Sequence, residues 1–312
     1  MMLARTASYL YWIGRYMERA EFTARLVEAT VRLDALSARP AGEGAWASAL
    51  SVASAKEDYE ATGESITPSN VANYLTLSES NSNSIRNCLY NARMNARAVR
   101  TALTREGWES INRAWLALRD RSATGGAQST INLVDELKAE IRGFEGAMHR
   151  MLRQDKHWML RLGAAIERAD NTARLIDVKY HLILPEGEEI GGVIDRDQWG
   201  TILQTVSANT AFRWLYRDGL SPGRVVEMLT LRRELPRSLA CCVEEVTEIL
   251  DEIGQETGFQ GEADRMARLR HKRLTGTKVG DIIRGGLHEF LQAFITENRL
   301  LSQAISRQFR FD

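Results

Sequence analysis

The sequence predicts an all-α fold of about twelve helices, arranged as two tandem, internally duplicated helical bundles with a pseudo-two-fold relation. Three observations support this fold class. Helix formers (Ala, Leu, Arg and Glu) fill long stretches of the 312-residue chain, which contains only five prolines. Apolar residues recur at three- and four-residue spacing, and no segment convincingly alternates as a strand does. A polar-rich segment at residues 14–26 returns at residues 163–175.

The first predicted helix is the longest of the first half. It is expected to begin near Thr6 and to end before Pro40, because Thr is a good N-cap and proline cannot continue a helix. Its equivalent in the second half is expected to run from Asp155 to Leu184. The apolar face of the first helix is predicted to consist of Ile13, Met17, Ala20, Ala24, Val27 and Val31.

The remaining helices follow the same periodicity. They are predicted at residues 46–62, 68–78, 82–105, 107–121 and 129–151, with counterparts in the second half. Pro68 and Pro222 each follow a Thr or Ser, which is typical of proline at the first helical position behind a capping hydroxyl. Gly and Pro clusters predict loops at 40–44, 125–126, 185–192, 254–261 and 276–280.

The internal repeat rests on polar residues. Eight of the thirteen positions in residues 14–26 are identical in residues 163–175, including a shared Glu-Arg-Ala string. Two amphipathic helices share apolar spacing by chance, but such a polar string does not recur that way. Weaker matches continue along both halves. The sequence therefore predicts two repeats of ordinary domain size, residues 1–150 and residues 151–312.

Composition excludes several functional classes. Acidic and basic residues balance at 41 each, which does not favour electrostatic binding to nucleic acid or to a membrane. No apolar run approaches the length of a membrane span. The three cysteines lack metal-binding spacing and suit a reducing compartment, so a cytoplasmic location is expected. No phosphate-binding loop or dinucleotide fingerprint occurs, and no cofactor is predicted.

A polar stripe on the repeated helix is the best candidate site. At about 100° per residue, Glu18, Glu21 and Arg25 fall on one face beside the apolar face. Their copies are Glu167, Asp170 and Arg174. Charges that border a core need partners, because unpaired burial is costly. Candidate acid–base residues are Glu18, Glu21, Glu167 and Asp170, and candidate ligand or junction residues are Arg15, Arg19, Arg25, Arg168, Arg174, Arg93, Asn95 and Arg97.

Two interpretations of this stripe remain open at this stage. In the structural one, i,i+4 Glu–Arg pairs and Arg–carboxylate forks lock the two stripes together, and small Gly14 and Gly163 allow the helices to approach closely. In the functional one, the stripe holds an anionic or zwitterionic ligand such as a peptide or an amino acid. Four carboxylates resemble those of di-metal bundles, but no Glu-x-x-His pattern is present and the arginines compete for the oxygens, so no metal is predicted.

These motifs resemble a known family. The opening residues 3–7 and 10–21, together with Trp158 and Glu167-Arg168-Ala169-Asp170, look like the characteristic strings of bacterial Alpha-E proteins. The strings at 91–97 and 236–239 are similar to that family as well. One departure is Ala164-Ala165, where the family more often repeats Gly-Arg and an aromatic or aliphatic residue.

The resemblance implies partners and leaves the activity open. Alpha-E proteins are typically encoded beside a circularly permuted ATP-grasp ligase and a transglutaminase-like protein, which implies a system that makes or modifies peptide (amide) bonds. The first hypothesis is an accessory or partner subunit of that system. The alternatives are an enzyme of the same pathway with Glu/Asp acid–base residues, or a purely structural scaffold. Fully paired charges would favour the accessory or scaffold role, and perturbed carboxylates facing an open pocket would favour the enzyme.

Overall fold

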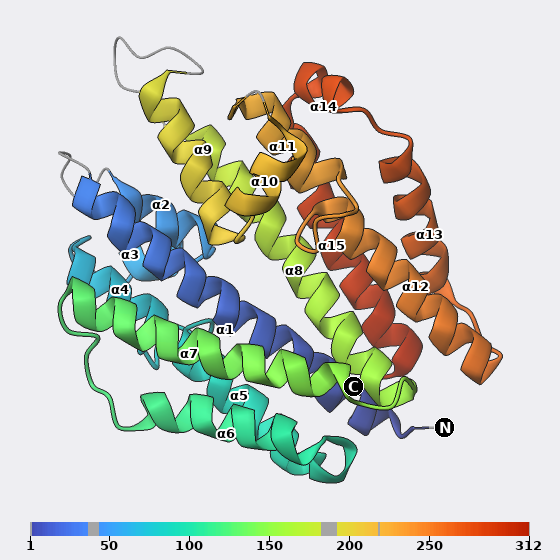
Figure 1. Ribbon diagram of the computed structural model, residues 1–312. Helices are drawn as coiled ribbons and strands as arrows, with labels where there is room; N and C mark the ends of the chain where they lie inside the picture. The colour runs from blue at the N-terminus through green and yellow to red at the C-terminus, as the bar shows by residue number, and fades with distance from the viewer. Residues whose placement is uncertain (1, 37–43, 182–191, 218, 312) are drawn as a thin grey trace. The chain divides into compact units, whose positions relative to one another are not determined.

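The computed structural model describes residues 2–36, 44–181, 192–217 and 219–311 (Figure 1). This described part contains fifteen α-helices and no strand, so the all-α class is confirmed and the expected number of about twelve is too low. None of its helices is both long and apolar enough to span a bilayer. The helices of the first half are α1 (Ala4–Leu36), α2 (Ala45–Val52), α3 (Lys56–Glu60), α4 (Pro68–Thr76), α5 (Ile85–Ala98), α6 (Arg105–Arg119) and α7 (Ala127–His149).

The second half contributes eight helices. These are α8 (Asp155–His181), α9 (Val193–Thr205), α10 (Asn209–Leu215), α11 (Pro222–Leu231), α12 (Leu239–Thr257), α13 (Glu262–Thr275), α14 (Val279–Gly285) and α15 (Leu287–Phe309). Helix α8 begins at Asp155 as predicted, whereas the expected end at Leu184 and most of the expected loops at 40–44 and 185–192 lie outside the described residues. The prediction of a loop over 254–261 is partly wrong, because α12 continues through Gly254 to Thr257.

The expected single helix over 46–62 is wrong, because the backbone reverses hand at Ser54. Ser54 has φ of 52°, and the amide of Ala55 donates to the carbonyl of Leu50, so α2 ends before α3 begins. Ser207 has φ of 56° and separates α9 from α10 in the same way. A serine in the left-handed region leaves little trace in a sequence, since glycine is the residue that usually marks it.

Helix starts agree in part with the capping predictions. Thr67 accepts the amide of Asn70 at 3.2 Å, with Pro68 at the first helical position. Pro222 also begins its helix, but the Ser221 hydroxyl makes no capping bond, so that part of the prediction is wrong. Helix α1 begins two residues before Thr6. The expected helix over 82–105 is interrupted, since α5 ends at Ala98 and a 3₁₀ turn, Arg100–Ala102, follows.

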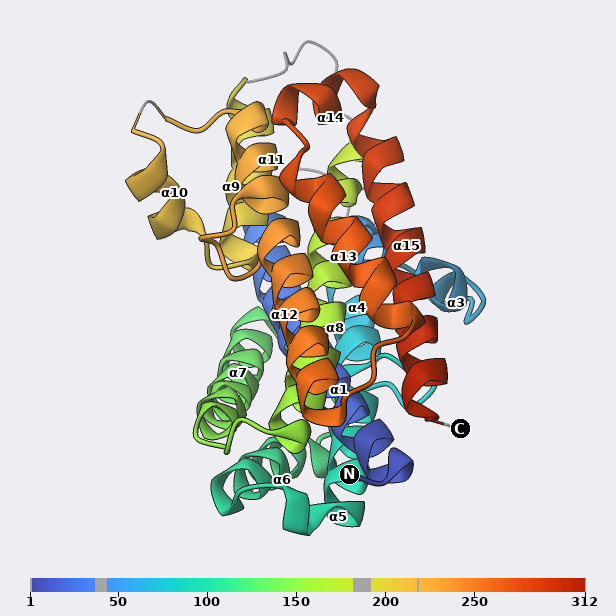
Figure 2. The same ribbon diagram turned by 90° about the vertical axis from the view of Figure 1, so that its right-hand side faces the viewer.

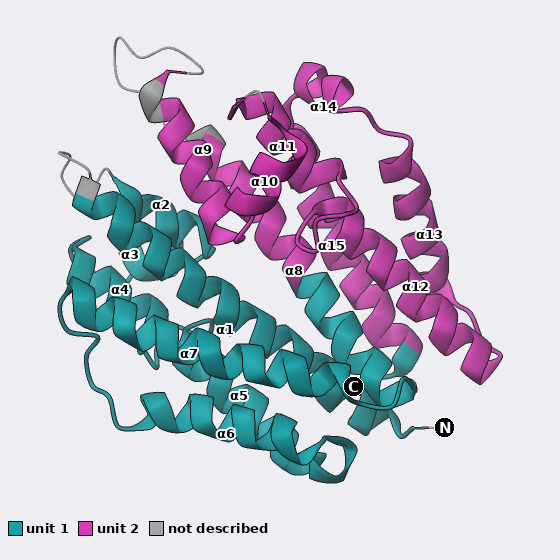
Figure 3. Cartoon of the chain, in the orientation of Figure 1, with its two compact units in different colours: residues 1–167, 309–312 teal, residues 168–308 magenta. Residues whose placement is uncertain are grey.

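The chain divides into two compact units (Figure 3). Unit 1 comprises residues 1–167 and 309–312, and unit 2 comprises residues 168–308. Helix α8 therefore contributes residues 155–167 to unit 1 and the rest of its length to unit 2. These units are defined by contacts in space, whereas the repeats 1–150 and 151–312 are defined by sequence, so the repeat boundary stays a prediction.

Unit 1 is built around α1. This helix packs against α5 and α7, and also contacts α2 and α4, while α6 packs against α5 and α7. All six residues of the predicted apolar face are buried, from Ile13 to Val31. A helix in contact with neighbours on several sides can leave few of its polar residues in water, and this is the setting of the charged stripe.

Two glycines allow α1 and α8 to touch backbone to backbone. A Cβ on Gly14 would lie 2.1 Å from the carbonyl oxygen of Leu160, and a Cβ on Gly163 would lie 2.0 Å from that of Tyr11. Both distances are far below van der Waals contact, and the obstacle is main chain that cannot rotate away. The predicted close approach at Gly14 and Gly163 is thus confirmed within unit 1.

The long helices α12, α13 and α15 pack together in unit 2. Helix α12 packs against α13, and α15 lies antiparallel beside α13 (Figure 2). The pairs Arg270–Asn298 and Arg307–Glu262 lie about two helical turns apart along α13 and α15. The short helix α14 contacts α11 and connects α13 to α15. This arrangement creates the apolar recess described below.

We predict that Gly14→Ala destabilises the protein by about 3 kcal/mol, because α1 and α8 must move apart to admit the methyl group. The matched control is Gly146→Ala on α7, where an added Cβ meets nothing within 4 Å. There, the better helix propensity of alanine should raise stability by about 0.5–1 kcal/mol. Urea denaturation of both variants measures the difference. Equal unfolding midpoints for the two variants would contradict the backbone contact.

Candidate functional site

The centre of the candidate site is the buried carboxylate of Glu167, which two arginines hold. Arg15 Nε donates to Glu167 Oε2 at 2.7 Å. Arg19 Nε donates to Oε1 at 2.6 Å, and Arg19 Nη2 donates to Oε2 at 3.1 Å. The Glu167 side chain is only 4% exposed. Both oxygens are therefore occupied, and the α1 arginines are tied to α8 beside the glycine contact.

Aromatic and polar neighbours complete the surroundings of the two arginines. The Arg15 guanidinium lies 5.0 Å from the ring centroid of Trp12. Arg19 Nη1 donates to Asn83 Oδ1 at 2.5 Å. Burial raises the pKa of the Cys88 thiol to about 12. The charge of Arg19 acts to lower this pKa, and the charge of Glu167 acts to raise it. Cys88 is therefore a neutral thiol at physiological pH and not a nucleophile.

The electrostatics keep Glu167 ionised. Burial alone would raise its pKa, but the charges of Arg19 and Arg15 and their hydrogen bonds outweigh burial and lower the pKa to about 2. In the same way, burial would lower the pKa of Arg19, and Glu167 raises it above its ordinary value. A carboxylate that stays charged and fully bonded at neutral pH cannot exchange a proton with a substrate. Glu167 is thus engaged as the ion-pair partner of Arg15 and Arg19.

The rest of the stripe forms pairs along its own helices. Arg25 Nη2 contacts Glu21 Oε1 at 2.5 Å, Arg32 Nη2 contacts Glu28 Oε1 at 2.5 Å, and Arg174 Nε contacts Asp170 Oδ2 at 2.6 Å. The three predicted i,i+4 pairs are confirmed. The Glu21 side chain is 1% exposed, which makes its pair far less accessible to water than an ordinary surface pair. Arg168 Nη1 lies 3.5 Å from Glu245 of α12.

The predicted site residues fall in different places. Glu18, Glu21 and Glu167 belong to unit 1 with Arg15, Arg19 and Arg25, whereas Arg168, Asp170 and Arg174 belong to unit 2. On α5, Arg93 Nε donates to Asn112 of α6 at 2.8 Å, and Arg97 is exposed. Among the described residues, no hydrogen bond or ion pair joins Arg93, Asn95 or Arg97 to Glu167.

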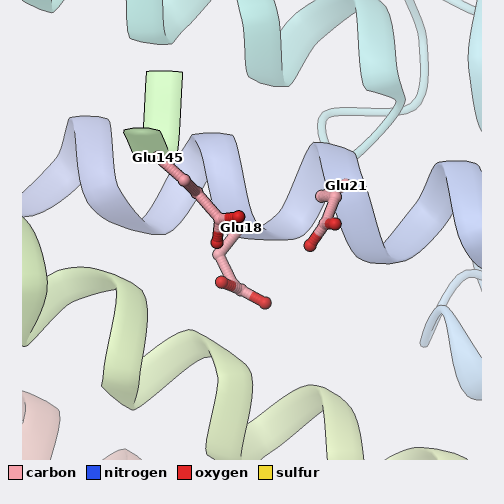
Figure 4. Close-up of side chains that lie close together, drawn as sticks. All are labelled: Glu18, Glu21 and Glu145. Carbon is pink, nitrogen blue, oxygen red and sulfur yellow. The ribbon is translucent and has the colours of Figure 1, made fainter. Parts of the chain in front are cut away.

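A second group of acids includes two residues of α1. One carboxylate oxygen from each of Glu18, Glu21 and Glu145 lies within 4.8 Å of the others, with Glu145 reaching from α7 toward Glu18 (Figure 4). Sequence reasoning missed Glu145, because nothing in the pattern of α7 distinguishes it from a surface acid. Three oxygens are about half of what calcium or magnesium requires, and Arg25 already occupies Glu21, so the absence of a bound metal stays the prediction.

The fold and this geometry define a class: helical-bundle proteins in which buried Glu–Arg ion pairs fix how the helices cross. The chain belongs to the Alpha-E family, whose match spans residues 2–309 and whose description reads "a predicted alpha-helical domain with a conserved ER motif". No curated protein and no solved structure matches the chain.

The Glu-Arg dipeptide of that description occurs twice in this chain, at Glu18-Arg19 and at Glu167-Arg168. The arginine of the first dipeptide bonds the glutamate of the second, through Arg19 and Glu167. The two occurrences are thus physically joined in the folded protein. In this structure, the Glu-Arg motif forms a contact between α1 and α8.

We predict that Glu167→Gln lowers the free energy of unfolding by about 3 kcal/mol, because it leaves two guanidiniums buried without their counter-charge. The matched control is Glu109→Gln, which removes the same charge from the exposed Arg105–Glu109 pair of α6 and should leave the unfolding midpoint unchanged. Urea denaturation at pH 7 compares the two. A Glu167→Gln variant as stable as Glu109→Gln would contradict the structural role.

The same ion pair should make stability depend on pH. The pKa of Glu167 is lowered in the folded state to about 2 from 4.5, so its stabilising contribution is complete above pH 4.5 and is lost as the pH falls toward 2. The contribution is on the order of 3 kcal/mol. The stability difference between wild type and Glu167→Gln should therefore shrink between pH 5 and pH 3 at constant ionic strength. A difference that stays constant over that range would show that Glu167 has an ordinary pKa.

Proposed function

We propose that this protein is a non-catalytic accessory subunit whose Glu-Arg motif fixes the geometry of its helices for binding a partner. The observation that carries the proposal is the Glu167 carboxylate, which is buried, ionised and bonded at both oxygens by Arg15 and Arg19. Such a group contributes rigidity and specificity of packing, not proton transfer. Fully paired charges are what the accessory and scaffold hypotheses expect.

The proposed partner is the ATP-grasp ligase of an amide-bond-forming system, with the transglutaminase-like protein as a further member. Support comes from the family to which the chain belongs, because the resemblance to that family implies an ATP-grasp ligase and a transglutaminase-like protein as partners. The balanced charge of the chain is consistent with a protein partner and does not favour nucleic acid or membrane. A peptide or amino acid bound by the pair of proteins together would be the shared substrate.

We also propose that the two halves of the chain derive from one duplicated unit. Four kinds of local structure recur at matching positions. Left-handed serines separate α2 from α3 and α9 from α10, and Ser84 and Ser238 cap α5 and α12 through the amides three residues on. Buried Thr76 and Thr230 each donate to the carbonyl four residues back, and prolines open α4 and α11. Such unrelated details coincide most simply through common descent of the two halves.

The alternative function is an enzyme of the same pathway. The observation that favours it is the cluster of Glu18, Glu21 and Glu145, the one place among the described residues where three acids meet closely enough to share a cation. Paired acids in a protected position are typical of general acid–base catalysis. The enzyme hypothesis requires these carboxylates to donate or accept protons during turnover, whereas the accessory proposal does not.

The first prediction for function is that the tagged full-length chain co-purifies with an ATP-grasp ligase of the proposed system from the same genome. The control is an unrelated helical protein with the same tag. We expect a defined complex on size-exclusion chromatography with light scattering. Separate elution of the two proteins at micromolar concentration would refute the accessory role.

The same reconstituted pair separates the accessory role from the enzyme. ATP-dependent amide formation should persist when Glu18 or Glu145 is changed, one at a time, to Gln in folded protein. Under the enzyme hypothesis the complex would still form, but product would fall by about a hundredfold or more, as is usual when a general acid or base is lost. That outcome would assign a catalytic role to the cluster of Glu18, Glu21 and Glu145.

A further inference from the structure

Unit 2 contains a half-open cavity between α13, α14 and α15. Its volume is about 360 Å³, which lies within the range of small-molecule sites. The walls are mainly apolar and include Val243 from α12, Leu274 from α13 and Ile282 from α14. Phe290 and Phe294 from α15 supply aromatic surface. An apolar recess of this size favours a ligand with a hydrocarbon or aromatic body.

A buried arginine lines this cavity. The Arg270 side chain is 7% exposed, and its Nε has no hydrogen-bond partner. Its other two nitrogens donate to neutral oxygens, with Nη1 at 3.2 Å from Asn298 Oδ1 and Nη2 at 3.4 Å from the carbonyl of Phe294. Burial lowers the pKa of Arg270 to about 10. The guanidinium is still charged at neutral pH, but it is poorly compensated.

The nearest carboxylate is shared with a second arginine. Glu297 Oε2 lies 3.6 Å from Arg270 Nε, which is too long for a hydrogen bond, and the same oxygen accepts a bond from Arg273 Nη2. Arg273 also lines the cavity. Asp281, at the other side, is paired with Arg284 at 2.5 Å. Arg270 and Arg273 therefore share the one carboxylate of Glu297, and Asp170 acts on Arg270 only from beyond ion-pair distance.

Packing alone does not require an arginine at this place. Helix α13 buries Ala263, Ala267, Arg270 and Leu274, and α6 buries Gly107, Ile111, Ala114 and Leu118 at the same spacing. The position of Arg270 in this pattern is Ala114 in α6. A small apolar residue therefore satisfies such a helix face, and the arginine introduces a desolvation cost that a bound anion would offset.

We propose that this cavity binds a small monocarboxylate with an apolar body, the carboxylate meeting Arg270 and Arg273 and the body lying against Phe290 and Phe294. A carboxylate matches the planar fork of a guanidinium and would supply the acceptor that the buried Arg270 Nε lacks. Mainly apolar walls disfavour a phosphate or a multiply charged anion. The site lies entirely in unit 2 and does not depend on the partner proposed above.

Isothermal titration calorimetry with the full-length protein at pH 7.5 tests this proposal with three probes. Phenylpropionate carries both the charge and the apolar body, phenylpropanol lacks the charge, and acetate lacks the body. We expect phenylpropionate to bind at least about tenfold more tightly than phenylpropanol, with acetate silent at the same concentration. Equal affinity for acid and alcohol, or no binding of phenylpropionate up to about 10 mM, would overturn the proposal.

Variants then locate the binding. Ala293→Trp places an indole in the cavity from an exposed position of α15 and should abolish binding, whereas Thr296→Trp, exposed on the same helix but outside the cavity lining, should retain it. Arg273→Gln should weaken phenylpropionate several-fold and leave phenylpropanol unchanged. Arg270→Met should remove the preference for the acid if it folds, and the other three variants decide the question if it does not. Undiminished binding by Ala293→Trp would place the ligand elsewhere and refute the site.

Discussion

The structure of unit 1 depends on one contact, the place where α1 and α8 touch at Gly14 and Gly163. Because the backbones meet there, the side chains beside the crossing are excluded from water, and Glu167 becomes a buried charge. A buried carboxylate persists only with partners of opposite charge. Arg15 and Arg19 are one turn of α1 apart and supply those partners. The glycines create the need for the ion pair, and the ion pair fixes the register in which the glycines meet.

This dependence gives a physical reason for the repeated polar string. Apolar residues in α1 tolerate exchange for others of similar size, but the Arg19–Glu167 fork requires both charges and their geometry. The Arg19–Glu167 ion pair forms only when the chain contains the Glu-Arg dipeptide twice, because each dipeptide supplies one of the two partners. The neighbouring pairs Glu21–Arg25 and Asp170–Arg174 stay within their helices, so the cross-helix contact is a property of particular positions of the stripe and not of all its charges.

Periodic features were predictable from the sequence, and features set by single contacts between distant residues were not. The apolar face of α1, the start of α8 at Asp155 and the glycine approach all follow from patterns that a sequence displays. The breaks at Ser54 and Ser207 depend on a backbone conformation that serine rarely adopts. Glu145 joins the acidic cluster only because α7 packs beside α1. Arg270 did leave a signal, since it occupies an apolar position of α13, but a charged residue on an apolar face is as often a paired structural group as a ligand contact.

The buried arginines at Glu167 and the buried Arg270 differ in how their charge is compensated by carboxylates. At Glu167, a carboxylate with both oxygens engaged raises the pKa of Arg15 and Arg19 despite their burial, and the charges are fully used inside the protein. At Arg270, burial dominates and the pKa is lowered, because the nearest carboxylate, Glu297, makes no hydrogen bond to Arg270 and is shared with Arg273. A closed set of charges stabilises a helix crossing, and an incomplete set beside a cavity retains attraction for an anion. The same type of side chain thus completes a closed ion pair at a helix crossing in unit 1 and lines an apolar cavity in unit 2.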